Sequence, residues 1–181
     1  MPQGTEDMHL AYVTLSGPDR VGLISAVTAA LFDLGANLAD TNFAVLGTGF
    51  EFNAVCELQN DIGLDDIEAG LAGLDELSDA DIVVEPFEHA VTPADNARIT
   101  HVIDVTGGDR PGLIARVTEA FLAFDANIVR MNSARQPGSG GTADYVTRFE
   151  VSIPAERAEQ CLAAVSNSAN QLSLTCNWRL A

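Results

Sequence analysis

Residues 16–42 read SGPDRVGLISAVTAALFDLGANLADTN, and residues 106–132 read TGGDRPGLIARVTEAFLAFDANIVRMN. When the sequence is shifted by 90 positions, 12 of the 26 residues from 17 to 42 are identical to their counterparts, without a gap. This period exceeds the roughly 20–50 residues of solenoid repeats and is the size of a small domain. The sequence therefore predicts a tandem duplication of one domain.

Composition is compatible with two small folded domains. The chain has 181 residues, of which 47% are hydrophobic, so each half can bury a core. No apolar run approaches the ~20 residues needed to cross a bilayer. The start, MPQGTEDMHL, lacks a basic segment followed by an apolar one, so no secretory signal is expected. These features predict a cytoplasmic protein without a membrane partner.

Charge argues against nucleic acid as a direct partner. Twenty-six acidic residues stand against nine basic ones, all of them arginine, which gives a net charge of −17. Such a chain repels phosphate backbones, and no basic cluster stands out. The absence of lysine also excludes a Schiff base and a phosphate-loop lysine.

Residue types that carry catalysis or bind metals are scattered. The cysteines, Cys56, Cys161 and Cys176, form no C-x-x-C motif and are expected to be reduced and mostly buried. The three histidines have no spacing typical of metal ligands. No catalytic acid pair or nucleophile–base set is evident. We expect neither an enzyme nor a protein with a cofactor or metal.

Hydrophobic periodicity gives each half the same order of elements. Strands are predicted at 9–15, 37–46, 50–58 and 80–88 in the first half, and at 97–106, 127–136, 143–153 and 171–180 in the second. Helices are predicted after residues 22 and 112, and again before the last strand of each half. The order β-α-β-β-α-β predicts an α+β fold of two ferredoxin-like domains, with antiparallel four-stranded sheets and helices on one face. The domains are expected at 8–90 and 97–181, joined by a polar linker near 89–98.

The turns GPDRVGL and GGDRPGL, each between a strand and a helix, are the candidate binding sites. A helix N-terminus presents unpaired N–H groups and suits a small anion such as a carboxylate. Glycines there offer no side chain to block a close ligand. The candidate residues are Gly17, Pro18, Asp19, Arg20, Val21, Gly22 and Leu23 in the first half, and Gly107, Gly108, Asp109, Arg110, Pro111, Gly112 and Leu113 in the second.

The same turns also have a purely structural interpretation. Asp19 and Asp109 are well placed to cap their helices, with Pro111 at a first helical position. The arginines of the two turns are then solvated or paired with acidic residues of a strongly negative surface. Both interpretations stay open at this point.

Two further polar positions complete the candidate site. Asn37 and Asn127 open the second strand of each half, where an amide can accept from an ammonium group and donate to a carboxylate. We expect each turn and asparagine to converge on one ligand. Asp40 is a further candidate for the ammonium group, and because its counterpart is Arg130, the two sites are not equivalent.

These residues resemble those of a known family. DRVGLISAVTAALFDLGANL and DRPGLIARVTEAFLAFDANI are both similar to the start of an ACT domain, a regulatory amino-acid-sensing module of ferredoxin-like fold. The two-domain length and FAVLGTGFEFNAVCEL (43–58) resemble the glycine cleavage system transcriptional repressor family. The resemblance extends from about residue 8 to 181.

The resemblance implies sensing rather than catalysis. ACT domains typically bind a small amino acid between two paired domains, through the turn before the first helix and the asparagine that opens the second strand. By position this implies Gly17–Leu23 with Asn37, and Gly107–Leu113 with Asn127. Glycine or serine is the ligand most compatible with it, a regulatory protein is the implied partner, and a homodimer is expected. The alternative is a structural or interaction module in which the interface has lost its ligand.

Overall fold

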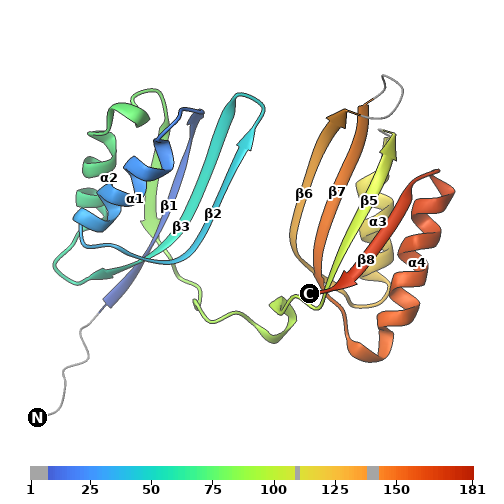
Figure 1. Cartoon of the computed structure of the whole chain (residues 1–181). Helices are drawn as coiled ribbons and strands as arrows, with labels where there is room; N and C mark the ends of the chain where they lie inside the picture. Colours follow the sequence, from blue (N-terminus) through green and yellow to red (C-terminus); the bar gives the residue numbers. More distant parts are fainter. Residues whose placement is uncertain (1–7, 109–110, 138–142) are drawn as a thin grey trace, which may run out of the picture. The chain divides into compact units, whose positions relative to one another are not determined.

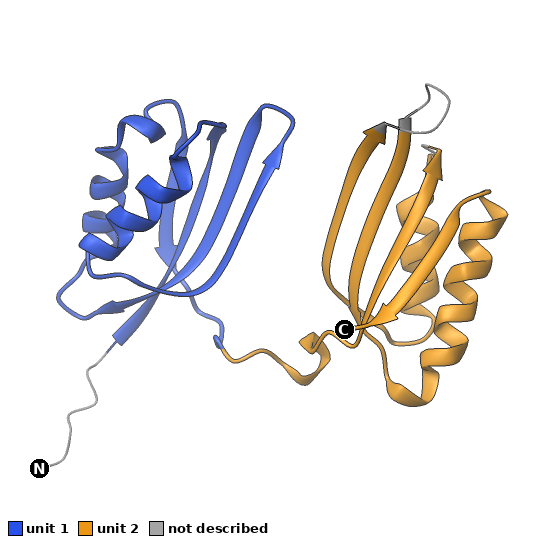
Figure 2. Ribbon diagram, in the orientation of Figure 1, with its two compact units in different colours: residues 1–91 blue, residues 92–181 orange. Residues whose placement is uncertain are grey.

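The computed structural model describes residues 8–108, 111–137 and 143–181. The chain divides into two compact units, residues 1–91 and 92–181, and the division lies within the polar stretch 89–98 (Figure 2). Among the described residues, no helix is long and apolar enough to cross a membrane.

Each unit has the predicted order of elements. The first contains β1 (Met8–Pro18), α1 (Leu23–Asp33), β2 (Asn37–Leu46), β3 (Gly49–Gln59), α2 (Leu64–Ala72) and β4 (Asp81–Pro86). The second contains β5 (His101–Gly108), α3 (Leu113–Leu122), β6 (Asn127–Pro137), β7 (Ala143–Ser152), α4 (Ala158–Gln171) and β8 (Thr175–Leu180). Short 3-10 turns lie at η1 (Asp75–Leu77), η2 (Asp95–Ala97) and η3 (Ala155–Arg157).

The two sheets share one topology. Their strand orders are β2-β3-β1-β4 and β6-β7-β5-β8, and every neighbouring pair is antiparallel. Both helices of each unit cover the same face of their sheet (Figure 1). The predicted pair of ferredoxin-like domains is thereby confirmed.

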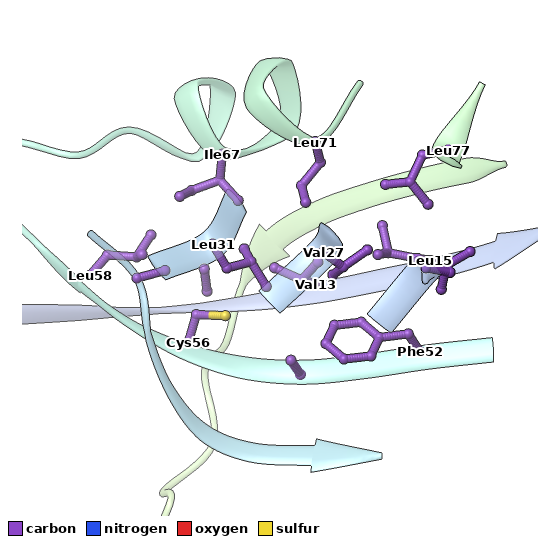
Figure 3. Close-up of a cluster of buried hydrophobic side chains, with 14 of the residues drawn as sticks. Val13, Leu15, Val27, Leu31, Phe52, Cys56, Leu58, Ile67, Leu71 and Leu77 are labelled. Carbon is purple, nitrogen blue, oxygen red and sulfur yellow. The ribbon is translucent and has the colours of Figure 1, made fainter. Parts of the chain in front are cut away.

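The core of each unit lies between sheet and helices. In β1, the buried residues Ala11, Val13 and Leu15 alternate with partly exposed ones, as a strand with one buried face requires. Figure 3 shows the helix residues Val27 and Leu31 beside Val13 of β1. Each fully buried aliphatic side chain contributes about 1.5–3 kcal/mol, so this packing determines which face each helix presents to the sheet.

Two predicted strands begin later than expected. The strand predicted at 97–106 begins at His101, because residues 95–97 form a 3-10 turn. The strand predicted at 171–180 begins at Thr175, because α4 continues to Gln171 and buries Ala169 against the core. Tertiary packing therefore overrode the local pattern at both ends.

The cysteines are free, as predicted. Cys56 and Cys161 are buried, whereas Cys176 is half-buried. Burial raises the pKa of the Cys56 thiol from 9.0 to about 11, and the pKa of the Cys161 thiol likewise to about 11.

We predict that Cys56 and Cys161 react at least about a hundredfold more slowly with a thiol reagent in the folded protein than in denaturant, since the thiolate is the reactive form. A colour assay for released thiol at pH 8, with and without denaturant, measures the two rates. Rapid reaction of three thiols without denaturant would contradict the burial.

The helix ends differ between the repeats. α1 is followed by Gly35, whose φ of +81° lies in the left-handed region, and Ala36 N–H then donates to Leu31 O at 2.9 Å. At the matching position after α3, Asp125 adopts a φ of +54° and pairs with Arg157. A non-glycine residue is strained in this region. Asp125 therefore destabilises the second domain locally, whereas Gly35 adopts the same conformation in the first domain without strain.

We expect opposite effects from exchanging these two positions. Asp125→Gly should raise the free energy of unfolding by about 0.5–1 kcal/mol, because relief of strain exceeds the loss of an exposed ion pair. Gly35→Ala should lower it by about 1–2 kcal/mol, since its Cβ would lie 2.8 Å from Ile62 Cδ1. Denaturant unfolding measures both changes, and a destabilised Asp125→Gly variant would disprove the account of strain.

Candidate ligand-binding site

Both candidate turns end on a glycine in the left-handed region. Gly22 has a φ of +90° and is the N-cap of α1, and Gly112 has a φ of +78° and is the N-cap of α3. The structural interpretation placed the cap at Asp19 and the first helical position at Pro111, and both assignments are wrong. The helices begin at Leu23 and Leu113, because a left-handed residue must precede them and glycine adopts that conformation without strain. Asp109, assigned to the same role, and Arg110 lie outside the described residues.

A glycine N-cap leaves the helix start open. Among the described residues, no side chain caps α1 or α3. In α1, Leu23 N–H donates to Arg20 O at 3.3 Å, whereas the N–H groups of Ile24 and Ser25 have no acceptor among the described residues. Unpaired N–H groups and the helix dipole together attract a small anion. These N–H groups, which a capping side chain would otherwise accept from, are therefore available to a ligand.

Two glycines are explained by contacts within their own unit. A Cβ on Gly17 would lie 2.9 Å from both Cα and Cβ of Ala80, and one on Gly107 would lie 2.5 Å from Leu174 Cδ2. The space beside these glycines is thus taken by the segment that enters the last strand. By contrast, a Cβ on Gly22, Gly108 or Gly112 would meet nothing within 4 Å.

Arg20 holds the first turn to the loop before β4. Its guanidinium donates to Asp75 O at 3.0 Å and to Ser78 Oγ at 3.2 Å, and it pairs with the carboxylate of Asp79. The predicted pairing of this arginine with a surface acid is confirmed. The positive charge at the turn is largely neutralised by this pairing, so the helix N-terminus is the stronger anion attractant there.

The remaining turn residues divide by exposure. Leu23 and Leu113 are buried in the two cores, so only their backbone can meet a ligand. Pro18, Asp19 and Val21 are exposed. Asp19 N–H donates to Thr48 O at 3.0 Å, which ties the turn to the hairpin between β2 and β3.

The asparagines lie at the other end of each sheet. In the first unit, Asn37 pairs with Glu57 and Pro18 pairs with Gly49, so eight residues of β3 separate the two positions. At about 3.3 Å per strand residue the separation is roughly 26 Å. The expectation that turn and asparagine converge within one domain is therefore wrong. One small ligand can touch both only if they come from different domains.

The asparagine amides also have partners within their units. Asn37 Nδ2 donates to Glu57 Oε2 at 2.7 Å, and Asn127 Nδ2 donates to Asn96 O at 2.8 Å. No donor among the described residues contacts either side-chain oxygen, so both can accept a hydrogen bond from a ligand.

The two candidate sites differ at one charged position, as expected from the sequence. Asp40 is exposed and lies opposite Val55, just after an irregularity in the β2–β3 register. Its counterpart Arg130 pairs with Glu150 at 3.2 Å. An ammonium group is therefore attracted by a carboxylate at the first position and meets a neutralised ion pair at the second.

A pocket that the sequence did not indicate lies in the second unit. It has a volume of about 470 Å³ and lies between α4 and the β5–β8 side of the sheet. Its residues are His101, Ala158, Glu159, Leu162, Ala163, Ser166, Trp178 and Leu180. They come from three distant segments and form no motif, so only the register of β5 with β8 brings them together.

Comparison with known proteins identifies the family. Two family models, each described as an ACT domain, match residues 9–85 and 101–166. Together they cover more than three quarters of the chain. The chain belongs to the ACT-domain family and contains two ACT domains in tandem.

The similarity to named proteins extends over most of the chain. The glycine cleavage system transcriptional repressors of Escherichia coli (strain K12) and Shigella flexneri are each 26% identical over 175 residues, which is 90% of this chain and 86% of theirs. A crystal structure of an unknown protein from Galdieria sulphuraria has a TM-score of 0.76 and 22% identity, and covers 97% of this chain and 99% of its own. At that identity the structural likeness establishes the fold.

The glycines of the turn give a matched pair of substitutions. We predict that Gly17→Ala lowers the free energy of unfolding by about 1–3 kcal/mol, because its Cβ would collide with the backbone of Ala80. Gly108→Ala should change stability by less than about 0.5 kcal/mol, since the space around it is open. Thermal or denaturant unfolding measures both changes. Equal effects of the two substitutions would show that Ala80 does not prevent a side chain at position 17.

Proposed function

We propose that this protein is an amino-acid-sensing regulator. It binds a small amino acid, glycine or serine in the first instance, where two ACT domains pair. It then acts on a protein partner in the transcriptional control of glycine metabolism. The proposal makes it a non-catalytic cytoplasmic protein that needs no cofactor or metal and does not itself bind nucleic acid.

The observation that carries this proposal is the open start of α1. Gly22 supplies no side-chain cap, and the N–H groups of Ile24 and Ser25 have no acceptor among the described residues. A carboxylate placed there would accept from these donors and interact favourably with the helix dipole. Gly112 gives α3 the same left-handed start, and no described side chain caps it, so α3 is the second position at which we propose binding.

The separation of turn and asparagine supports a site shared between two domains. If two sheets pair with opposite strand directions, the turn of one domain approaches the asparagine of the other. The carboxylate of a zwitterion would then bind the helix start, and its ammonium group would donate to the asparagine oxygen, with Asp40 as a further attractant in one site.

The edge strands offer a surface for that pairing. β2 and β6 each form one edge of their sheet, opposite β4 and β8, and each has ten or more residues. Phe43, Val45 and Leu46 of β2 and Met131 of β6 are exposed apolar residues. A long edge with exposed apolar side chains favours strand pairing with another domain. We propose that pairing involves both domains of the chain and a second copy in a homodimer.

Two comparisons support regulation as the function. The chain is built from ACT domains, and the relatives from Escherichia coli and Shigella flexneri are named as transcriptional repressors of the glycine cleavage system. A net charge of −17 disfavours contact with DNA phosphates, so action through a protein partner fits the chain better than direct repression.

A ligand-free interaction module is the second candidate. Gly17 and Gly107 are both packed against their own unit, and Arg20 is engaged by Asp79, so part of each turn has a structural explanation. On this alternative, paired domains present a fixed surface to the partner, and no amino acid changes it.

Calorimetric titration separates the two candidates. We predict saturable heat for glycine or serine, and a loss of at least about tenfold in affinity for Asn37→Ala or Asn127→Ala, because a hydrogen bond to a charged group contributes about 1.5–3 kcal/mol. The exposed loop residue Asn60 gives the control variant Asn60→Ala, which should bind like the unaltered protein.

No heat and no thermal shift with any of the twenty amino acids would favour the ligand-free module. Binding that is unaffected by either asparagine substitution would place the ligand elsewhere and contradict the shared site.

A further inference from the structure

The pocket of the second unit is separate from the candidate turns and the proposed function does not use it. It lies beside α4 and the end of the sheet formed by β5 and β8, and its volume of about 470 Å³ is within the range of small-molecule sites. Leu162, Ala163 and Leu180 give it a predominantly apolar lining.

One polar ring is built into this lining. His101 is 7% exposed, although it belongs to the lining of the pocket. Its Nδ1 forms a hydrogen bond with Thr100 Oγ1 at a distance of 2.9 Å. The other ring nitrogen, Nε2, has no partner among the described residues. No buried side-chain nitrogen or oxygen of the described residues lacks a hydrogen-bond partner, so Nε2 is accessible rather than enclosed. Because His101 lines the pocket, this nitrogen can orient a ligand there.

The bonds around Thr100 determine what Nε2 offers. Thr100 Oγ1 accepts from Ile153 N–H at 2.9 Å and lies 3.2 Å from Val151 O. A carbonyl only accepts, so the hydroxyl proton must go to Val151 for that contact to be a hydrogen bond. His101 Nδ1–H then donates to Oγ1, which makes all three contacts hydrogen bonds. Nε2 is left as an acceptor, and burial lowers the pKa of His101, which favours this neutral ring.

The rest of the lining determines which ligand suits that acceptor. Trp178, 52% exposed, meets His101 in an edge-to-face contact with ring centroids 6.0 Å apart, and its exposed part is available to another flat group. Glu159 contributes the only formal charge among the lining residues, and it is negative. An anion is therefore repelled, while an apolar body is favoured.

We propose that this pocket binds a small uncharged organic molecule that has an apolar, preferably aromatic, body and one hydrogen-bond donor, which is received by His101 Nε2. The body packs on Trp178, Leu162 and Ala163. The site is a property of the second domain, because the positions of the first domain that match His101, Trp178 and Leu180 are Ala11, Val84 and Pro86.

Trp178 is the only tryptophan of the chain and reports directly on the pocket. Its fluorescence, excited at the red edge of the indole band, is followed during titration of the full chain with three probes of similar size. Benzyl alcohol has a donor, benzyl methyl ether lacks one, and benzoate is an anion. We expect a saturable change with benzyl alcohol, about tenfold weaker binding of the ether, and no saturable change with benzoate.

Three variants locate the effect. Ala163→Phe fills the pocket and should abolish binding of both neutral probes. Ala29→Phe makes the same change on an exposed helix position of the first domain and should leave binding unchanged. His101→Leu should weaken benzyl alcohol about tenfold, to the level of the ether, and leave the ether unaffected. If His101→Leu does not fold, the comparison of alcohol with ether still tests the hydrogen bond, and Ala163→Phe still tests whether the probes bind in this pocket.

Several results would overturn the proposal. Equal affinity for the alcohol and the ether would show that His101 Nε2 does not accept a hydrogen bond from the ligand. Saturable binding of benzoate would contradict the predicted exclusion of anions. Linear quenching by all three probes would indicate collision rather than a site. An emission that depends on protein concentration but not on benzyl alcohol would show that a second copy covers the pocket.

Discussion

Each domain starts its first helix from a glycine whose φ is positive, and the proposed sensor depends on this conformation. Gly22 and Gly112 turn the chain from strand to helix without supplying a capping side chain. A threonine or aspartate cap would occupy the donors at the helix start. Glycine instead leaves the N–H groups at the helix start free. The positive end of the helix dipole is then exposed at the surface of the domain. The duplication repeats this arrangement once in each half of the chain.

The fold was readable from the sequence because its determinants are local and repeated. The helix predicted after residue 22 coincides with α1, whose buried residues Leu23, Val27 and Leu31 recur at helical spacing. The strand predicted at 37–46 coincides with β2. Strand starts were less accurate, since the limits of β5 and β8 depend on how a 3-10 turn and the long helix α4 pack, which no local pattern expresses.

The site was less predictable than the fold. Aspartate is a preferred helix cap, yet Asp19 is not the cap, because the left-handed turn at Gly22 moves the helix start beyond its reach. The convergence of turn and asparagine failed for a geometric reason: α1 returns the chain along the length of the sheet, so Asn37 begins β2 at the end opposite the turn. His101 and Trp178 become neighbours only through strand pairing, which residue spacing in the sequence does not reveal.

The central claim is that one amino acid joins the helix start of one ACT domain to the asparagine of another. Nuclear magnetic resonance of amide groups during titration with glycine or serine tests it most directly. The account predicts that backbone amides of the first helical turn, at Ile24 and Ser25 or at their counterparts after Gly112, shift along the same binding curve as the side-chain amide of Asn37 or Asn127. Turn amides that shift while both asparagine side chains stay unchanged, or a spectrum that no amino acid perturbs, would contradict it.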